Sequence, residues 1–157
     1  MPTVGLRPVE DSDLDAIFEQ MRDPASVTMA AFTTEDPNDR TTFDSHMARV
    51  LDAPDITHRA VTCDDQLVGT IAAFPAEGVI EVTYWIDRSY WGQGVASRAL
   101  ELLLQEVPMR PICARVATDN IGSLRVLEKA GFKAVGTEVS YAAARGTAIE
   151  ETVLELS

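Results

Sequence analysis

A short run of small residues stands between an apolar, strand-like segment and an amphipathic, helix-like segment. Gly92, Gly94 and Ala96 occupy alternate positions in this run, so side chains do not keep a ligand away from the backbone. The helix that begins after them offers free N–H groups and the positive end of its dipole to an anion. Because phosphate groups bind well at such a junction, the loop predicts a phosphate-bearing ligand.

The residues around the loop exclude two common nucleotide sites. A nucleotide P-loop requires Gly-Lys-Ser or Gly-Lys-Thr, and no such triplet follows here. The dinucleotide fingerprint requires a third glycine where this chain has Ser97, and it follows a strand that opens a parallel βαβ unit. A tight turn that leads the helix onto the sheet is the alternative interpretation of the same glycines.

A second polar group lies between a buried strand and the next helix. Asn120 offers an amide to the amide groups of a ligand, and Ser123 can point a hydroxyl donor at a leaving group. The alternative is purely local, because Asn is a favoured N-cap residue and a first-turn Ser often bonds only to nearby backbone.

Hydrophobic periodicity and turn residues predict the elements that position these groups. The predicted strands cover residues 3–7, 56–63, 67–74, 79–86, 111–117, 133–142 and 148–156. The predicted helices are a segment between the cap at Asp11 or Ser12 and Asp23-Pro24, residues 25–31, a segment opened by Pro37, and residues 94–107 and 121–130. This order indicates a mixed sheet with helices on both faces, an α/β or α+β fold that is not all-parallel.

Length and cysteine content constrain the protein further. With 157 residues, the chain is expected to form a single domain over residues 1–157. Cys63 and Cys113 lie in apolar, strand-like runs and are expected to be reduced core residues. No spacing of His and Cys residues indicates a metal site.

The charge and the chain start argue against two classes of partner. A net charge of −12 argues against nucleic acid, because proteins neutralise phosphates with clustered Lys and Arg. Acidic residues concentrate in the first third, as a solvated surface or as a rim that attracts a cationic amine. The chain has no apolar stretch of the roughly 18 residues that span a membrane, and its start lacks the form of a signal peptide. We therefore expect a cytoplasmic protein without a membrane partner.

Three runs together resemble the GNAT acetyltransferases, above all the branch that includes ribosomal-protein N-terminal acetyltransferases. They are Tyr84-Trp85-Ile86 with residues 90–96, then Asn120-Ile121-Gly122-Ser123, and Lys129-Ala130-Gly131-Phe132. The opening Leu6-Arg7-Pro8 also looks like that branch, so the resemblance covers nearly the whole chain. It implies a mixed, mostly antiparallel central sheet with a splayed pair of central strands, and acetyl-CoA as cofactor.

The resemblance also implies how the cofactor is held. In the family the glycine-loop amides hold the pyrophosphate of acetyl-CoA, and the backbone of the preceding strand pairs with the pantetheine amides like an added strand. This chain has Trp91 where the family usually has Arg or Gln, so phosphate binding is expected to depend on backbone N–H groups and on Gln93. The implied contacts are Trp85, Ile86, Asp87, Trp91, Gly92, Gln93, Gly94, Val95, Ala96, Ser97, Asn120 and Ser123.

Catalytic roles follow from the same resemblance. An amine with a pKa of about 10 must lose a proton before it attacks at neutral pH. Glu81 lies where some family members carry a catalytic glutamate, and alternation places it opposite Ile80 and Val82. It is the candidate base, with a water relay or a merely solvent-facing role as alternatives. Ser123 matches the family residue that protonates the thiolate, and Tyr141 is a looser alternative.

These features predict an acetyl-CoA-dependent N-acetyltransferase that moves an acetyl group to a primary amine by direct transfer in a ternary complex. The first alternative is a catalytically silent CoA-binding sensor or partner-binding module with the same fold, and the second is a nicotinamide or nucleotide binder. The acceptor is expected to be an amine-bearing small molecule or a peptide N-terminus, and the resemblance allows a homodimer. His46 and His58 are expected to be structural or exposed.

Overall fold

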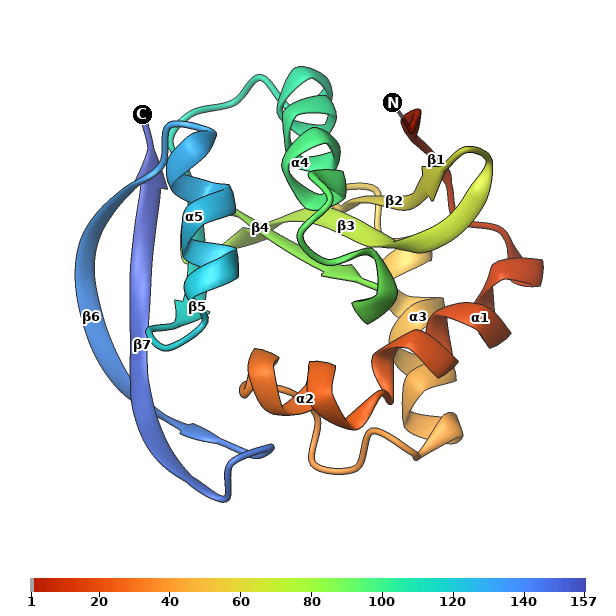
Figure 1. The fold of residues 1–157 in the computed structure, drawn as a ribbon, viewed down its shortest axis with the longest axis horizontal. Helices are drawn as coiled ribbons and strands as arrows, with labels where there is room; N and C mark the ends of the chain where they lie inside the picture. The colour runs from red at the N-terminus through yellow and green to blue at the C-terminus, as the bar shows by residue number, and fades with distance from the viewer. Residues whose placement is uncertain (1) are drawn as a thin grey trace.

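A seven-stranded mixed sheet forms the middle of the structure (Figure 1), a computed structural model that describes residues 2–157. The strand order is β1-β2-β3-β4-β5-β7-β6, and all neighbours are antiparallel except β4 and β5, which are parallel. The strands are β1 (Val4–Pro8), β2 (Thr57–Cys63), β3 (Gln66–Ala76), β4 (Val79–Ile86), β5 (Ile112–Ala117), β6 (Lys133–Ala142) and β7 (Thr147–Leu156).

Helices cover both faces of this sheet, with α4 and α5 on one side and α1, α2 and α3 on the other (Figure 1). They are α1 (Leu14–Met21), α2 (Pro24–Ala30), α3 (Arg40–Asp52), α4 (Val95–Glu106) and α5 (Ile121–Lys129), with short 3-10 turns η1 (Asp11–Asp13) and η2 (Arg88–Tyr90). The predicted mixed fold is confirmed. None of the helices in the described part of the chain is long and apolar enough to cross a membrane.

The start of α3 corrects one expectation. The side chain of Asp39 accepts a hydrogen bond from the N–H of Thr42 at 3.1 Å, so the helix begins after Asp39 and not at Pro37. The physical reason is that a proline offers a suitable φ, whereas an aspartate at the N-cap supplies an acceptor for an N–H group that the helix leaves unpaired.

The turn between β3 and β4 is shorter than predicted, because β3 continues through Pro75, which lies opposite Ile80. A hydrogen bond from the N–H of Asp87 to the carbonyl of Val68 makes residues 87 and 68 a bonded pair of this ladder. Bonded pairs recur at every second residue, so the pair of Pro75 and Ile80 is not hydrogen-bonded. The missing N–H of the proline therefore removes no bond between these two strands.

The hydrophobic core lies between the sheet and the pair α4 and α5. Val95, Ala99, Leu100 and Leu103 turn one face of α4 into this core, and none of them is more than 1% exposed. Burial of such side chains contributes about 1.5–3 kcal/mol for each residue of Val or Leu size. The beginning of α4 is therefore held firmly against the end of β4, where the glycine loop lies.

The parallel strands β4 and β5 meet only near their first residues. Their paired positions are Ile80 with Ile112 and Glu81 with Cys113. Beyond these pairs, β4 continues along β3 and β5 continues along β7, while the two strands separate. The predicted splayed pair of central strands is confirmed, and it leaves an open backbone edge on the second half of β4.

Candidate active site

A cavity of about 490 Å³ opens where β4 and β5 diverge. Its walls are the end of β4, the glycine loop with the first turn of α4, the first half of α5, and α2. The lining residues are Ser26, Met29, Ala30, Tyr84, Trp85, Ile86, Tyr90, Trp91, Gly92, Gly94, Val95, Ala96, Ser97, Asn120, Gly122, Ser123, Arg125 and Val126. Among the predicted cofactor contacts, only Asp87 and Gln93 are outside this lining.

The glycine loop presents its backbone to the cavity. Gly92 (φ +74°) and Gly94 (φ +80°) adopt left-handed conformations, and no described atom lies within 4 Å of a Cβ added at either position. The first intrahelical bond of α4 runs from the N–H of Arg98 to the carbonyl of Gly94 at 3.1 Å. Within the described chain, the N–H groups of residues 95–97 have no partner, as expected at a helix start. Open space and free donors together fit a pyrophosphate.

Only every second residue of β4 turns its backbone N–H and C=O groups toward the gap. The N–H of Asp87 donates to the carbonyl of Val68 in β3 at 2.7 Å, and bonded positions recur at every second residue of an antiparallel ladder. The backbone polar groups of Trp85 and Asp87 therefore face β3, whereas those of Tyr84 and Ile86 face the gap. Within the predicted stretch from Trp85 to Asp87, the register makes Ile86 available to a ligand.

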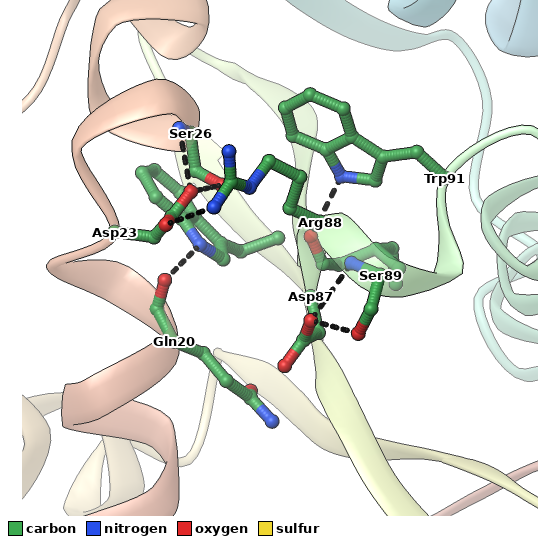
Figure 2. Close-up of polar contacts among 9 residues, drawn as sticks. Gln20, Asp23, Ser26, Asp87, Arg88, Ser89 and Trp91 are labelled. Atoms are coloured by element: carbon green, nitrogen blue, oxygen red, sulfur yellow. Dashed lines mark hydrogen bonds and ion pairs between the residues drawn. The ribbon is translucent and has the colours of Figure 1, made fainter.

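The indole of Trp91 already contacts this edge. Its Nε1 donates a hydrogen bond to the carbonyl oxygen of Ile86 at 2.8 Å (Figure 2). Trp91 is 41% exposed and lines the cavity. The amide Nε2 of Gln93 donates to the carbonyl of Ser89 at 3.0 Å, so this side chain contacts the loop itself.

One ion pair connects the start of α2 to η2, and local caps hold each of its two partners in place (Figure 2). Asp23 caps α2 by accepting hydrogen bonds from the N–H of Ser26 at 3.0 Å and from its hydroxyl at 2.8 Å. The same carboxyl group pairs with the guanidinium of Arg88 at 3.2 Å. Asp87 caps η2 by accepting from the N–H of Ser89 at 2.9 Å and from its hydroxyl at 2.6 Å. The wall that α2 contributes is therefore tied to the segment before the glycine loop.

Ser123 lies in the first turn of α5 and faces the cavity. The side-chain oxygen of Asn120 accepts a hydrogen bond from the N–H of Ser123 at 3.2 Å, so Asn120 caps α5 and also lines the cavity. The Oγ of Ser123 lies 2.6 Å from the phenol oxygen of Tyr84. Burial raises the pKa of Tyr84 to about 12, so its phenol stays protonated at neutral pH.

Glu81 lies at the last paired position before β4 and β5 separate, on the face opposite the core, as its alternation predicts. Its carboxyl group is 3.7 Å from Arg115, which also pairs with Glu138 at 2.7 Å and with Glu151 at 3.3 Å. Burial raises the pKa of Glu81, Arg115 opposes this shift, and the charges of Glu151 and Glu77 add to it. Glu81 is outside the cavity lining, unlike Ser123.

The remaining predicted side chains lie away from the cavity. Tyr141 is 65% exposed on β6. His46 contacts Arg49 through Nδ1 at 3.0 Å, whereas the Nδ1 of His58 is buried with no hydrogen-bond partner among the described residues. Cys63 and Cys113 are free thiols, the first buried and the second half-buried.

Eight lining residues were not among the predicted contacts: Ser26, Met29, Ala30, Tyr84, Tyr90, Gly122, Arg125 and Val126. Ser26 and Arg125 come from helices that the fold brings together, and no spacing pattern connects them. Tyr84 could have been found, because alternation along β4 places it on the core face with Val82 and Ile86, toward α5.

The sheet splays between two parallel strands, and a glycine loop opens a helix at the gap, so a free strand edge lies beside free helix N–H groups. A family model described as an acetyltransferase (GNAT) domain matches residues 3–133. The chain therefore belongs to the GNAT acetyltransferase family. This membership confirms the predicted family and acetyl-CoA as the cofactor of that family.

Individual relatives match over part of their length. The chain is 36% identical over 81 residues to the probable N-acetyltransferase YjcK of Bacillus subtilis (strain 168), covering 46% of this chain and 45% of that protein. It is 33% identical over 76 residues to the ribosomal-protein-serine acetyltransferase of Escherichia coli (strain K12), covering 44% and 42%. The matched segment therefore spans less than half of either relative.

Structural similarity covers more of the chain than the sequence matches do. A solved structure of RimL, a ribosomal L7/L12 alpha-N-protein acetyltransferase in complex with coenzyme A, matches with a TM-score of 0.83. The match covers 98% of this chain and 93% of that chain at 18% sequence identity. It confirms the architecture from β1 to β7.

Proposed function

We propose that this protein is a single-domain N-acetyltransferase that moves an acetyl group from acetyl-CoA to a primary amine by direct transfer in a ternary complex. One observation carries the proposal: the free N–H groups of the glycine loop, the open edge of β4 and the hydroxyl of Ser123 line the same cavity. The first two suit a pyrophosphate and a chain of amides. The third suits a leaving thiolate.

Three groups of this chain have proposed roles in the transfer: one accepts a proton, one donates a proton, and one polarises a carbonyl. Bound acetyl-CoA supplies a thioester carbonyl and a thiolate leaving group. Glu81, whose pKa is raised by burial, takes the amine proton directly or through water. Ser123, at the positive end of the α5 dipole, donates its O–H to the departing thiolate. A backbone N–H on the open edge of β4 polarises the carbonyl.

Thermal unfolding with acetyl-CoA, NAD and ATP tests the cofactor site. At about 100 times the dissociation constant, binding adds about 2.7 kcal/mol, which raises Tm by about 5–10 °C in a domain of this size. We expect this shift with acetyl-CoA alone and its loss in Gly94→Val. A matching shift with NAD or ATP supports the nucleotide binder instead.

Gly78→Val is the matched control for Gly94→Val. Gly78 lies in the β3–β4 turn at φ +84°, close to the +80° of Gly94, and no described atom lies within 4 Å of an added Cβ at either position. Both variants therefore carry similar backbone strain, and only Gly94→Val should abolish the acetyl-CoA shift. Loss of the Tm shift in both variants would mean that general destabilisation, and not a damaged cofactor site, abolishes it.

Thiol release in an amine screen separates an enzyme from a silent CoA-binding module, which binds acetyl-CoA and turns over no amine. With an accepted amine, Glu81→Gln and Ser123→Ala should each lower kcat by about 10²-fold with little change in acetyl-CoA affinity. Glu138→Gln is the matched control, because Glu138 contacts the same Arg115 from an exposed position. Rates equal to wild type in Glu81→Gln or Ser123→Ala would remove that assignment.

We propose a peptide N-terminus or a small amine as the acceptor and a homodimer as the assembly. The names of two similar proteins favour the peptide, since both refer to acetylation of ribosomal proteins. The screen should therefore set short peptides with N-terminal Ser against free amino acids and polyamines. Light scattering measures the mass of the assembly, and a monomeric mass would contradict the proposed homodimer.

A further inference from the structure

Tyr84 and Ser123 meet across the gap between the diverging strands. Tyr84 belongs to β4, and Ser123 belongs to α5, which follows β5. Their side-chain oxygens are 2.6 Å apart, and the phenol oxygen is 3.4 Å from the backbone carbonyl of Ser123. Both residues line the cavity. This contact therefore connects the two halves of the site where the sheet itself does not.

Either hydroxyl can donate in the 2.6 Å contact, and two considerations favour Tyr84. Within the described chain, the phenol of Tyr84 has acceptors only on Ser123, and the Oγ of Ser123 has Tyr84 as its only partner. If Ser123 donated, the phenol proton would be left with a carbonyl at 3.4 Å, which is a long and weak contact. A phenol is also more acidic than an aliphatic hydroxyl and is the stronger donor. Both considerations favour Tyr84 as the donor, which leaves the O–H of Ser123 without a partner among the described residues.

We propose that Tyr84 is a positioning residue, which donates its phenol O–H to the Oγ of Ser123 and thereby directs the Ser123 proton into the cavity, toward the sulfur of bound CoA. The inference rests on the proposed function, because it needs a sulfur near Ser123. Once Tyr84 fills one lone pair of Oγ, the only O–H of Ser123 is free for a ligand. Successive hydrogen bonds also polarise one another, so Ser123 becomes a stronger donor.

Tyr84 does not supply the proton itself. Tyr84 is half-buried and its pKa is raised to about 12, so loss of its proton is unfavourable throughout the neutral range. Tyr84 therefore keeps its proton while Ser123 donates to the sulfur. The role is one of orientation, and it predicts that the effect of Tyr84 passes entirely through Ser123.

The pKa of the thiol of bound CoA reports this orientation without any acceptor amine. Free CoA is added to the purified protein, and thiolate absorbance in the ultraviolet is followed against pH in the binary complex. A hydrogen bond to the thiolate lowers the thiol pKa by about 1 unit. We expect the wild type to show this lowering, Ser123→Ala to lose it, and Tyr84→Phe to lose most of it.

A double variant tests whether Tyr84 acts through Ser123, and a substitution at another tyrosine serves as the control. Tyr84→Phe combined with Ser123→Ala should give the same thiol pKa as Ser123→Ala alone, because Tyr84 acts only through Ser123. Tyr141→Phe should leave the thiol pKa at the wild-type value, since Tyr141 is exposed and lies outside the cavity lining. Thermal unfolding of each variant confirms that it is folded under the conditions of the titration.

The outcomes separate this inference from the function beneath it. A wild-type thiol pKa in Tyr84→Phe, with a raised value in Ser123→Ala, overturns the role of Tyr84 alone. An unchanged thiol pKa in Ser123→Ala overturns the proposed role of Ser123 and this inference with it. Failure of the wild type to bind CoA overturns the cofactor site and everything built on it.

Discussion

The indole Nε1 of Trp91 donates a hydrogen bond to the carbonyl oxygen of Ile86 at 2.8 Å, on the backbone edge that β4 leaves open. A ligand that adds to this edge like a strand has to compete with the indole for the same acceptor. Trp91 also stands where the family pattern has Arg or Gln. The indole thus occupies an acceptor on the edge that we propose for the pantetheine amides.

Trp91→Phe should therefore tighten acetyl-CoA binding, because it keeps an aromatic ring and removes the competing N–H. A neutral hydrogen bond contributes about 0.5–1.5 kcal/mol, so we expect roughly a fivefold lower Kd by calorimetry. Trp85→Phe is the control, because the indole of Trp85 donates to the carbonyl of Gln20 at 3.0 Å and not to the open edge. Weaker binding in Trp91→Phe would mean that the indole is part of the bound site.

Gly69→Ala should destabilise the protein strongly. A Cβ at Gly69 would lie 2.1 Å from the carbonyl oxygen of Trp85 and 3.0 Å from the Cα of Ile86, so β3 and β4 would have to separate. Overpacking of this kind costs about 1–3 kcal/mol or more, which urea denaturation measures. Gly136→Ala is the control, because nothing among the described residues lies within 4 Å of its Cβ position. Equal stabilities of the two variants would contradict this reading of the sheet.

Asp23→Ala should lower the free energy of unfolding by about 1 kcal/mol, the usual effect of losing an N-cap. The carboxyl group of Asp23 caps α2 through Ser26 and also pairs with Arg88. Arg88→Gln removes only the ion pair, which is exposed and contributes about 0–1 kcal/mol. Chemical denaturation of both variants tests this order, and a larger loss in Arg88→Gln would mean that the ion pair dominates.

The stability of the protein should fall below pH 6.5 in part because of His58. Burial, together with the charges of His46 and Arg59, lowers the pKa of His58 to about 4. Unfolded chains take up this proton near a pKa of about 6.5, so the folded state binds fewer protons between the two values. The contribution is complete above that window and is lost as the pH falls from about 6.5 to about 4.

His58→Leu should flatten this part of the pH profile. At pH 5 the lowered pKa accounts for about 2 kcal/mol of lost stability, so the variant should lose about that much less than the wild type between pH 7 and pH 5. Urea denaturation at the two pH values measures the difference. Parallel losses in both proteins would show that other groups control the acid response.

Local patterns predicted most of the elements correctly. The apolar spacing of α4 and α5 and the alternation of β4 each reflect contacts within one segment, and caps such as Asn120 are local hydrogen bonds. The errors arise where two local signals compete. Pro37 and Asp39 both mark a helix start, and the acceptor at Asp39 determines it because an unpaired N–H is satisfied there.

By itself, the sequence determined the order of strands and helices, the place of the glycine loop and the family resemblance, because these depend on residues close together along the chain. The tertiary structure decided the rest. Strand register assigned the open edge to Tyr84 and Ile86, and the approach of α5 to β4 placed Ser123 within 2.6 Å of Tyr84. It also left Glu81 beside Arg115 and outside the cavity lining. Distances between segments far apart in the chain follow from packing, which no local spacing encodes.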